Sequence, residues 1–592
     1  MCGIVGYIGY RQAQPVLLNC LSKLEYRGYD SCGIAVNNGH LRGFKDAVRV
    51  EALKAELPSL EGSLGIGHTR WATHGKPTAI NAHPHFDCTG KVAVVHNGII
   101  SNFEELRLHL LKEGHTFVSD TDTEVIPHLI EKYYQGDPIG AFQTALTRLE
   151  GSFAIAVLFE KYDKLLVSRR ESPLVVGIGD NETVIASDVP ALLEYVDNVI
   201  YLEDGDTAVI SKDGVLIEQN GAAADRTVHH VNWDRSKVEK NGYDHFLIKE
   251  IHEQPDVIKD SLSGFFGSQE EEKDSLIDSN LSGLTMLGCG TSYNACLVGK
   301  YIFEELLGIP VRVESASEFM QRGRIISSPV VIGLTQSGET ADVLLSLKRL
   351  KKPQVKILVI TNVPGSTASR IADQVIYTAA GPEMSVAASK SYMAQLIELF
   401  KMAFTSKLLD TATRERLLKE FRSLNVIVQR VLETEREIAE CANILARSST
   451  AFYVGRGINY PTALEGALKL KEISYIHAEG YAAGELKHGP LALLDEKTPV
   501  VALVTPEEVY GSMVSTVKEI KARGSPVIAL ADERDDSIAS IADFVIKLPH
   551  TSGIFAPVVN VVALQLLAYY AAKFRGCPID FPRNLAKSVT VV

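Results

Sequence analysis

Hydrophobic and polar positions follow two different rhythms along this chain of 592 residues. In the first part, short apolar runs alternate with polar turns, and apolar residues at helical spacing are few. The runs that predict strands are residues 64–68, 92–96, 153–159, 164–168 and 183–186, and those that predict helices are residues 20–24 and 103–111. Many strands with few helices between them predict an α+β domain rich in sheet.

The rhythm changes after residue 280, where strongly apolar runs alternate with longer helical patterns. The predicted strands are residues 284–288, 311–314, 330–335 and 355–361, and the predicted helices are residues 292–307 and 340–350. This alternation predicts a parallel sheet covered by helices on both faces.

The pattern then recurs, since residues 287–295 resemble 454–462 and residues 330–335 resemble 500–505. Two copies of a doubly wound α/β unit are therefore expected, with a helical bridge at residues 412–446. The copies differ where Ser337–Thr340 of the first corresponds to Pro506–Val509 of the second.

The chain is too long for one hydrophobic core, so several domains are expected. Residues 221–242 are polar and glycine-containing, which is typical of a linker. The expected limits are a sheet-rich domain at 2–225, a linker at 226–242, a first doubly wound domain with a leading helical segment at 243–425, a second with the helical bridge at 426–578, and a tail at 579–592.

Charge and composition narrow the classes of function. The net charge of −13 and the lack of a basic stripe argue against a nucleic-acid partner. The eight cysteines show no paired spacing, so neither a disulfide scaffold nor a zinc cage is indicated. The N-terminal residues lack the pattern of a signal peptide. Residues 554–572 are apolar enough to raise a membrane question, but Pro557, Asn560 and Gln565 favour a buried helix, so we expect a cytoplasmic protein without a membrane partner.

Cys2 is the first candidate catalytic residue. Removal of Met1 would expose its α-amine, which titrates near about 7.7–8 and can accept the thiol proton. The alternative is a cysteine that happens to come second. Three further segments favour catalysis: Arg70 suits a carboxylate, Asn97 and Gly98 follow a predicted strand and can form an oxyanion hole, and Asp122 can hold an ammonium group. Together they describe a pocket for a zwitterionic amide such as glutamine.

Residues 1–6, 24–30, 68–75, 81–85 and 95–98 resemble the N-terminal-nucleophile glutamine amidotransferase family. The resemblance implies a four-layer αββα sandwich in which glutamine acylates Cys2 and releases ammonia, while Asn97 and Gly98 stabilise the oxyanion. The glutamine-binding residues that it implies are Arg70, Trp71, Thr73, His74 and Asp122.

Five histidines raise the possibility of a metal site: His68, His74, His83, His85 and His96. Their spacing is that of strands and loops, and no acidic ligand lies at a diagnostic interval. Structural hydrogen bonding is the better explanation, so we expect no metal.

Two segments of the first doubly wound copy are candidates for binding phosphate. Residues 335–340 and 289–292 each follow a predicted strand and begin a helix, where free N–H groups and hydroxyls favour an anion. Ordinary helix capping would explain either alone, but ligands gather where two such segments meet at one sheet. The pair resembles the sugar isomerase (SIS) domain, which implies these phosphosugar-binding residues: Cys289, Thr291, Ser292, Thr335, Gln336, Ser337, Thr340, Val386 and Ala388.

The second copy offers ionisable residues instead. Glu465, Lys469 and Glu472 lie on one face of a predicted helix, where a solvated salt-bridge stripe is the simple alternative. A glycine- and proline-bounded loop presents His488, and Lys587 lies in the tail.

The complete set of motifs resembles the glucosamine-6-phosphate synthase family. The resemblance implies transfer of ammonia from L-glutamine to fructose 6-phosphate with isomerisation, giving glucosamine 6-phosphate and L-glutamate for hexosamine and UDP-N-acetylglucosamine synthesis. Lys587 would form a Schiff base with the opened ketose, His488 would assist ring opening, and Glu472 would move a proton between C1 and C2. Lys469 would support Glu472, and Ala586 would contact the sugar. No cofactor is implied, and relatives form homodimers through their SIS domains.

Two rival functions remain. An amidophosphoribosyltransferase shares the glutaminase, but it needs a phosphoribosyl-pyrophosphate loop with adjacent acidic residues after a strand, and the sequence shows none. A sugar-phosphate sensor would have an inactive synthase half, which Glu472, His488 and Lys587 disfavour.

Overall fold

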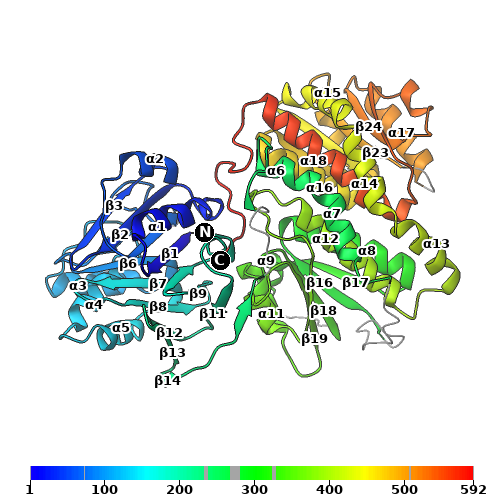
Figure 1. The fold of residues 1–592 in the computed structure, drawn as a ribbon. Coiled ribbons are helices and arrows are strands. Elements are labelled where there is room, and N and C mark those ends of the chain that lie inside the picture. Colours follow the sequence, from blue (N-terminus) through cyan, green and yellow to red (C-terminus); the bar gives the residue numbers. More distant parts are fainter. Residues whose placement is uncertain are drawn as a thin grey trace. The chain divides into compact units, whose positions relative to one another are not determined.

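The computed structural model describes residues 2–72, 74–231, 238–266, 281–322, 328–505 and 509–590. The chain divides into two compact units. Unit 1 comprises Met1–Val238 together with Ala586–Val592, and unit 2 comprises Glu239–Leu585 (Figure 1). The last residues of the chain therefore belong with the first unit and not with the residues that precede them.

Unit 1 is built on two sheets. The first has eight strands in the order β15-β11-β9-β10-β1-β4-β2-β3, and the second has seven in the order β14-β13-β12-β8-β7-β6-β5. The strands are β1 (Gly3–Ile8), β2 (Ser31–Asn37), β3 (Leu41–Asp46), β4 (Leu64–Arg70), β5 (His85–Phe86), β6 (Val92–Ile100), β7 (Gly151–Phe159), β8 (Leu165–Arg170), β9 (Val175–Gly179), β10 (Glu182–Ala186), β11 (Asn198–Tyr201), β12 (Asp206–Ser211), β13 (Gly214–Gln219), β14 (Ala222–Ala223) and β15 (Val228–His230). The helices are α1 (Ala13–Ser22), α2 (Val50–Glu56), α3 (Phe103–Lys112), α4 (Val125–Tyr133) and α5 (Pro138–Leu146).

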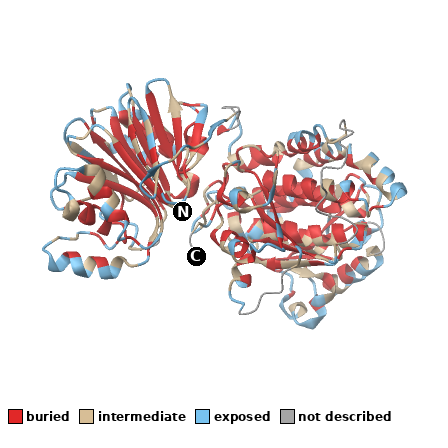
Figure 2. Ribbon diagram, turned by 90° about the horizontal axis from the view of Figure 1, so that it is seen from below, coloured by how far each residue is buried: buried red, intermediate tan, exposed pale blue. Residues whose placement is uncertain are grey.

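The two sheets pack face to face. One hydrophobic cluster joins Ile4 and Ile66 of the first sheet to Val95 and Ala156 of the second. Burial is continuous along β1, β2 and β4, whose residues face the partner sheet on one side and helices on the other. Figure 2 shows this as strands coloured almost entirely as buried.

Helices cover both outer faces of the sandwich. α1 lies against the glycines of β4, where a Cβ on Gly65 would come within 2.8 Å of Leu17 and one on Gly67 within 2.9 Å of Leu21. On the opposite side, α3, α4 and α5 bury their apolar faces against β6 and β7. The order helix, sheet, sheet, helix confirms the expected αββα sandwich.

The predicted elements of unit 1 need two corrections. The helix expected at residues 20–24 begins earlier, at Ala13, and ends at Ser22. β6 does not end at residue 96 but continues to Ile100, because Asn97 and Gly98 pair with Ala154 and Phe153 of β7. The oxyanion-hole candidates thus lie within a strand rather than after it.

Unit 2 contains two parallel sheets of five strands, in the orders β17-β16-β18-β19-β20 and β22-β21-β23-β24-β25. The strands are β16 (Leu284–Gly288), β17 (Val311–Ser315), β18 (Val330–Thr335), β19 (Lys356–Thr361), β20 (Gln374–Tyr377), β21 (Thr450–Gly455), β22 (His477–Ala482), β23 (Val500–Val504), β24 (Val527–Asp532) and β25 (Phe544–Leu548). The helices are α6 (Phe246–His252), α7 (Gln254–Leu262), α8 (Gly290–Leu307), α9 (Ala316–Phe319), α10 (Ala341–Leu350), α11 (Thr367–Ile371), α12 (Lys390–Thr405), α13 (Thr411–Phe421), α14 (Leu424–Glu433), α15 (Glu435–Ala446), α16 (Asn459–Ser474), α17 (Tyr510–Lys521) and α18 (Ala556–Phe574).

The two sheets share one topology, which confirms the repeat seen in the sequence. In each copy the first strand pairs with the second on one side and with the third on the other. The chain therefore reverses direction across the sheet between β16 and β18, and again between β21 and β23. Ligands bind at such switch points, outside the carboxyl ends of the strands.

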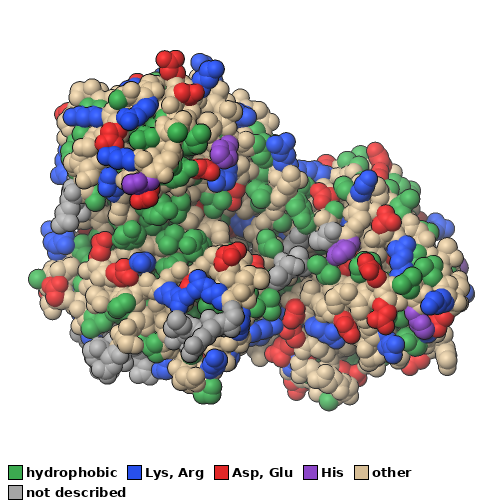
Figure 3. Space-filling view, turned by 180° about the vertical axis from the view of Figure 1, so that it is seen from behind, with side chains coloured by type: hydrophobic (Ala, Val, Ile, Leu, Met, Phe, Trp, Pro, Cys, Tyr) green, Lys and Arg blue, Asp and Glu red, His purple; other side chains and the backbone are tan. Residues whose placement is uncertain are grey.

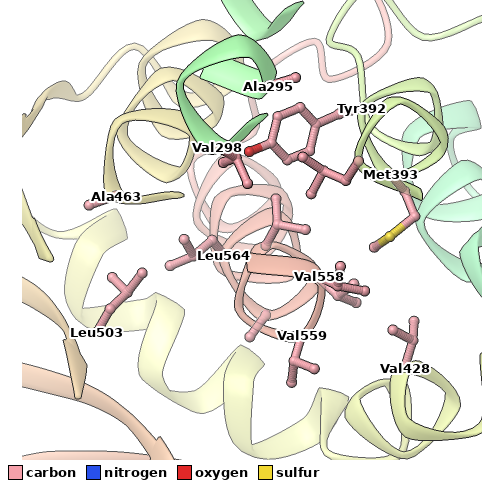
Figure 4. Packing of buried hydrophobic residues seen from close by; sticks show 14 of the residues in the cluster. Ala295, Val298, Tyr392, Met393, Val428, Ala463, Leu503, Val558, Val559 and Leu564 are labelled. Atoms are coloured by element: carbon pink, nitrogen blue, oxygen red, sulfur yellow. The ribbon is translucent and has the colours of Figure 1, made fainter. Parts of the chain in front are cut away.

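α18 forms the centre of unit 2. It is long and apolar enough to cross a membrane. However, 94% of its most apolar 18-residue stretch is buried inside the protein, which is typical of a core helix. Figure 4 shows Val558, Val559 and Leu564 of α18 surrounded by side chains from α8, α12, α14, α16 and β23. Both copies of the doubly wound unit thus pack on the same helix.

The surface carries charges of both signs. Figure 3 shows acidic and basic side chains interspersed on the visible face of the molecule. The excess of acidic residues therefore gives no single charged stripe on this face.

Candidate functional site

Cys2 lies immediately before β1, and its half-buried thiol contacts the end of the neighbouring strand β4. The backbone N–H of Trp71 donates to Sγ at 3.2 Å, and the thiol faces the carbonyl oxygen of the same residue at 3.5 Å. These two contacts hold the sulfur against the backbone of Trp71. The Trp71 ring packs edge-on against Tyr29, with 5.6 Å between the ring centroids.

Asn97 and Gly98 lie beside the nucleophile. The Asn97 side chain donates from Nδ2 to the carbonyl oxygen of Cys2 at 3.0 Å, and its Oδ1 lies 3.1 Å from Nε2 of His68. Gly98 has φ 121°, and a Cβ there would come within 2.0 Å of the carbonyl oxygen of Ser152. Only glycine accepts that conformation and that close approach. β6 therefore holds an amide next to Cys2 in a defined orientation, as an oxyanion hole requires.

Arg70 and Asp122 are both buried, and the charges of Cys2 and Asp122 act on Arg70. Burial lowers the pKa of Arg70, whereas the charges of Cys2, Asp122 and Asp30 act to raise it. Arg70 donates to the carbonyl oxygens of His74 and of the two residues that follow it. The Asp122 carboxylate accepts from the N–H of Ile100 at 2.9 Å. A buried cation and a buried anion near each other suit the carboxylate and ammonium groups of an amino acid substrate.

Two of the predicted glutamine-binding residues need separate mention. His74 lies beside Phe103, with 5.3 Å between the ring centroids, and its backbone accepts from Arg70. Thr73 lies outside the described residues.

Four of the five histidines considered as metal ligands form a hydrogen-bonded group. His68 and His83 are stacked 4.0 Å apart, and His85 and His96 bond to Thr121 and Thr123, the residues on either side of Asp122. Burial is the main cause that lowers the pKa of all four imidazoles, that of His68 to about 3. The group supports the Asp122 loop in the way that structural hydrogen bonding predicts.

These neutral imidazoles predict a dependence of stability on pH. Because their pKa values are lowered in the folded protein, they favour folding fully above about pH 6.5 and progressively less as the pH falls toward 3. His68 alone contributes a slope of about 1.4 kcal/mol per pH unit in that window. Calorimetric unfolding of the full chain from about pH 8 to about pH 4 measures the effect. His68→Gln, which keeps a side-chain N–H donor, is expected to flatten the curve, and an unchanged slope in this variant would contradict the assignment.

The first phosphate-binding candidate lies between β18 and α10. The hydroxyls of Thr335 and Thr340 are 3.1 Å apart, and the N–H of Gly338 donates to Thr335 Oγ1 at 3.2 Å. Gly338 has φ 67°, and a Cβ there would come within 2.1 Å of Ser366 Oγ. Gln336 and Ser337 are half-buried at the tip of this turn. A tight turn of hydroxyls at a helix N-terminus can receive a phosphate.

The second candidate lies at the same edge of the sheet, because β16 pairs in parallel with β18. Cys289 occupies the N-cap position of α8, and Ser292 Oγ accepts from Gln395 Nε2 at 3.0 Å. Thr291 Oγ1 donates to Glu465 Oε1 at 3.0 Å. Two predicted phosphosugar segments are thus adjacent, as the sequence indicated.

The face of α16 is not a solvated salt-bridge stripe. The side chains of Glu465 and Lys469 are 0% and 2% exposed, and Lys469 Nζ lies 2.7 Å from Glu472 Oε2 and 3.0 Å from Thr291 Oγ1. Burial acts against the charge of Lys469, but the carboxylates of Glu472 and Glu465 raise its pKa overall. Lys469 therefore remains a cation that ties α16 of the second copy to α8 of the first. Glu472, with 21% of its side chain exposed, is the accessible carboxylate of the group.

The remaining sugar-site candidates are spread over unit 2 and the tail. His488 is exposed and ends a short 3₁₀ helix, Ala483–His488, where a loop was predicted. The N–H of Val386 donates to the carbonyl oxygen of Asp580, and Ala388 is half-buried just before α12. Ala586 and Lys587 belong to unit 1, where Lys587 N approaches the carbonyl oxygen of Tyr26 at 3.5 Å. Their participation in the sugar site stays a prediction.

Sequence reasoning missed three partners of these residues. Asp30 accepts from the N–H of Ala72, which lies in the segment predicted to bind glutamine. Asn294 bonds to the buried Glu465, and Gln395 bonds to Ser292. Asn294 could have been found, since it lies one helical turn from Gly290; Gln395 comes from a distant helix and gave no local signal.

Family models match most of the chain. A SIS domain model matches residues 279–406 and 444–574, and a glutamine amidotransferase domain model matches residues 68–194. The two SIS matches correspond to the two doubly wound copies.

Relatives match over their whole length. A protein of Thermococcus kodakarensis named glutamine–fructose-6-phosphate aminotransferase [isomerizing] is 49% identical over 608 residues, covering 100% of both chains. One of the same name from Caldanaerobacter subterraneus subsp. tengcongensis is 46% identical over 609 residues, again covering 100% of both. The solved C-terminal domain of glucosamine-fructose-6-phosphate aminotransferase from Francisella tularensis aligns with a TM-score of 0.55 and 35% identity, covering 58% of this chain and 99% of that one. The chain therefore belongs to the family of isomerizing glutamine–fructose-6-phosphate aminotransferases.

Proposed function

We propose that the chain hydrolyses L-glutamine at Cys2 and transfers the ammonia to D-fructose 6-phosphate. Ketose–aldose isomerisation then gives D-glucosamine 6-phosphate, with L-glutamate as the second product. One observation carries this function: in unit 1 the charges of Cys2 and Asp122 act on the buried Arg70, and in unit 2 of the same chain two hydroxyl-bearing turns lie at one sheet edge. The combination favours an amidotransferase of a phosphosugar over an amidophosphoribosyltransferase.

In the glutaminase reaction, removal of Met1 gives Cys2 a free α-amine that accepts the thiol proton. Sγ attacks the amide carbon of glutamine, whose carboxylate and ammonium groups bind Arg70 and Asp122. Asn97 Nδ2 and the N–H of Gly98 stabilise the oxyanion, ammonia leaves, and water releases glutamate. Trp71, Thr73 and His74 complete the pocket. The contact of Asn97 with the Cys2 backbone supports this assignment.

In the synthase reaction, the phosphate of the sugar binds the turns at 289–292 and 335–340, with Val386, Ala388 and Ala586 beside the sugar. His488 assists ring opening, and the amine of Lys587 forms a Schiff base at C2 of the open ketose. Ammonia displaces the lysine, and Glu472 moves a proton between C1 and C2. The ion pair between Lys469 and Glu472 supports a defined orientation of that carboxylate.

The function is tested with glutamine labelled with ¹⁵N at the amide and with fructose 6-phosphate. We expect labelled glucosamine 6-phosphate and glutamate in equal amounts. Glutamate without amino sugar would indicate a sensor with an inactive synthase half. Product formation that requires phosphoribosyl pyrophosphate would indicate the other rival.

The remaining expectations belong to the same proposal. Domain limits at 2–225, 243–425 and 426–578 are compatible with the two compact units and the two SIS matches. A homodimer through the SIS domains and a cytoplasmic location suit an enzyme of small polar substrates. Analytical ultracentrifugation of the full chain tests the first of these two.

A further inference from the structure

Four potential metal ligands converge in unit 1 among residues to which the proposed reaction gives no role. Cys88 lies in the turn between β5 and β6, His115 follows α3, and His128 and Glu131 lie three residues apart on α4. One ligand atom from each residue, Sγ, two imidazole nitrogens and a carboxylate oxygen, lies within 4.8 Å of every other. These segments are far apart in sequence, so the fold itself assembles the group.

Three of four distances agree with those between the corners of a zinc tetrahedron, and the fourth, between Glu131 Oε2 and His115 Nδ1, is shorter by about 0.5 Å. Cys88 Sγ is 3.7 Å from His115 Nδ1 and 3.4 Å from His128 Nδ1. Glu131 Oε2 is 2.9 Å from His115 Nδ1 and 3.4 Å from His128 Nδ1. With bonds of about 2.3 Å to sulfur and about 2.0–2.2 Å to nitrogen and oxygen, tetrahedral geometry requires about 3.6 Å and about 3.4 Å for these pairs.

Hydrogen bonds alone cannot account for all four contacts at the same time. Each of the two Nδ1 atoms approaches both the sulfur and the same carboxylate oxygen, which makes four close pairs. One thiol and two imidazoles supply at most three protons at these atoms, and a protonated Nδ1 directs its hydrogen to one partner at a time. A cation at the centre satisfies all four electron-pair donors at once.

Two of the ligands have further hydrogen-bond partners. The N–H of Thr116 donates to Cys88 Sγ at 3.4 Å, and the backbone N–H of Cys88 donates to Glu131 Oε2 at 3.3 Å. His128 is 1% exposed, and its other nitrogen, Nε2, lies 3.7 Å from the Glu124 carboxylate. A carboxylate at the distal nitrogen is the usual partner of a metal-bound histidine.

We propose that Cys88, His115, His128 and Glu131 form a tetrahedral zinc site. Mixed thiolate, imidazole and carboxylate ligands suit Zn²⁺, and four protein ligands leave no position for substrate, so the site is structural. Binding releases the thiol proton of Cys88 to solvent. The ion would join the β5–β6 turn to α4, whose preceding loop carries Asp122. This differs from our expectation that the chain holds no metal, and it does not depend on the proposed function.

The test uses the full chain without a histidine tag, incubated with zinc and then dialysed. Elemental analysis is expected to find about one zinc ion per chain. Cys88→Ser and His115→Gln should each lose it, while Cys577→Ser, which changes a half-buried thiol in unit 2, should retain it. Equal zinc content in wild type and Cys88→Ser, or no zinc in any of them, would overturn the proposal.

Two further measurements keep the test decisive if a ligand variant folds poorly. Cobalt substitution of the wild type should give the visible bands of tetrahedral Co²⁺ and a thiolate-to-cobalt charge-transfer band, and a spectrum of octahedral Co²⁺ would contradict the site. Glu124→Gln leaves all four ligands in place and is expected to weaken zinc binding by about 10–100-fold. An unchanged affinity would contradict the role of Glu124 as the partner of His128 Nε2. Zinc held equally by every variant would overturn the site and indicate adventitious binding only.

Discussion

Replacement of Cys2 by alanine is expected to reduce glutamine hydrolysis by at least about 1000-fold, because the acyl-enzyme cannot form at this position without the thiol. The same variant should still make glucosamine 6-phosphate from fructose 6-phosphate and added ammonium salt. Arg70, Asn97 and Asp122 do not depend on the thiol for their hydrogen bonds to neighbouring residues, so the pocket should remain folded. Glutamate release and amino-sugar formation are measured separately.

Cys577→Ala is the matched control, since its half-buried thiol contacts only the carbonyl oxygen of Ser474 among the bonds described. It should keep both activities. Continued glutamine hydrolysis by Cys2→Ala would show that the nucleophile lies elsewhere. Loss of ammonium-dependent synthesis together with hydrolysis would instead point to misfolding, which circular dichroism would reveal.

Replacement of Lys587 by alanine is expected to have the opposite pattern. Formation of glucosamine 6-phosphate should fall by at least about 1000-fold with either glutamine or ammonium as nitrogen source, because the Schiff base cannot form. Glutamine hydrolysis should persist. Borohydride reduction of the wild type with fructose 6-phosphate should add the mass of one sugar phosphate to the peptide that contains Lys587.

Lys573→Ala provides the control, because Lys573 is an exposed lysine whose ion pair with Asp244 contributes little to stability. It should leave both activities and the trapped adduct unchanged. An adduct on a lysine other than Lys587 would refute the assignment of the tail. Retained synthesis in Lys587→Ala would exclude a Schiff base at this residue.

The buried parallel sheets could be predicted closely from the sequence. β16 and β18 have the predicted limits, because each is a short run of apolar residues between turn signals. The repeat was also visible, since the order of apolar runs and glycines is local information. The sandwich of unit 1 was harder to predict, because its antiparallel strands have weak hydrophobic patterns. Its edge strands β14 and β15 lie in the segment whose composition indicates a linker.

The site was predictable in its residue types but not in its contacts. The end of β6 depends on pairing with β7, which lies about fifty residues later, so Asn97 and Gly98 were placed after the strand. The burial of Glu465 and Lys469 depends on α8 of the other copy, which a helix-face pattern cannot reveal. The group of Cys88, His115, His128 and Glu131 was not predicted, because its contacts also depend on segments far apart in sequence. His128 and Glu131, three residues apart on one helix, gave a partial signal.

The common packing of both SIS copies on α18 has a consequence for how unit 2 unfolds. A helix whose side chains contact the elements of both copies cannot leave one without exposing apolar surface of the other. The two copies should therefore melt in a single cooperative transition rather than as two independent tandem modules. A fragment that ends before residue 556 would lack the hydrophobic support of its first copy as well as its second, and aggregation is its expected fate.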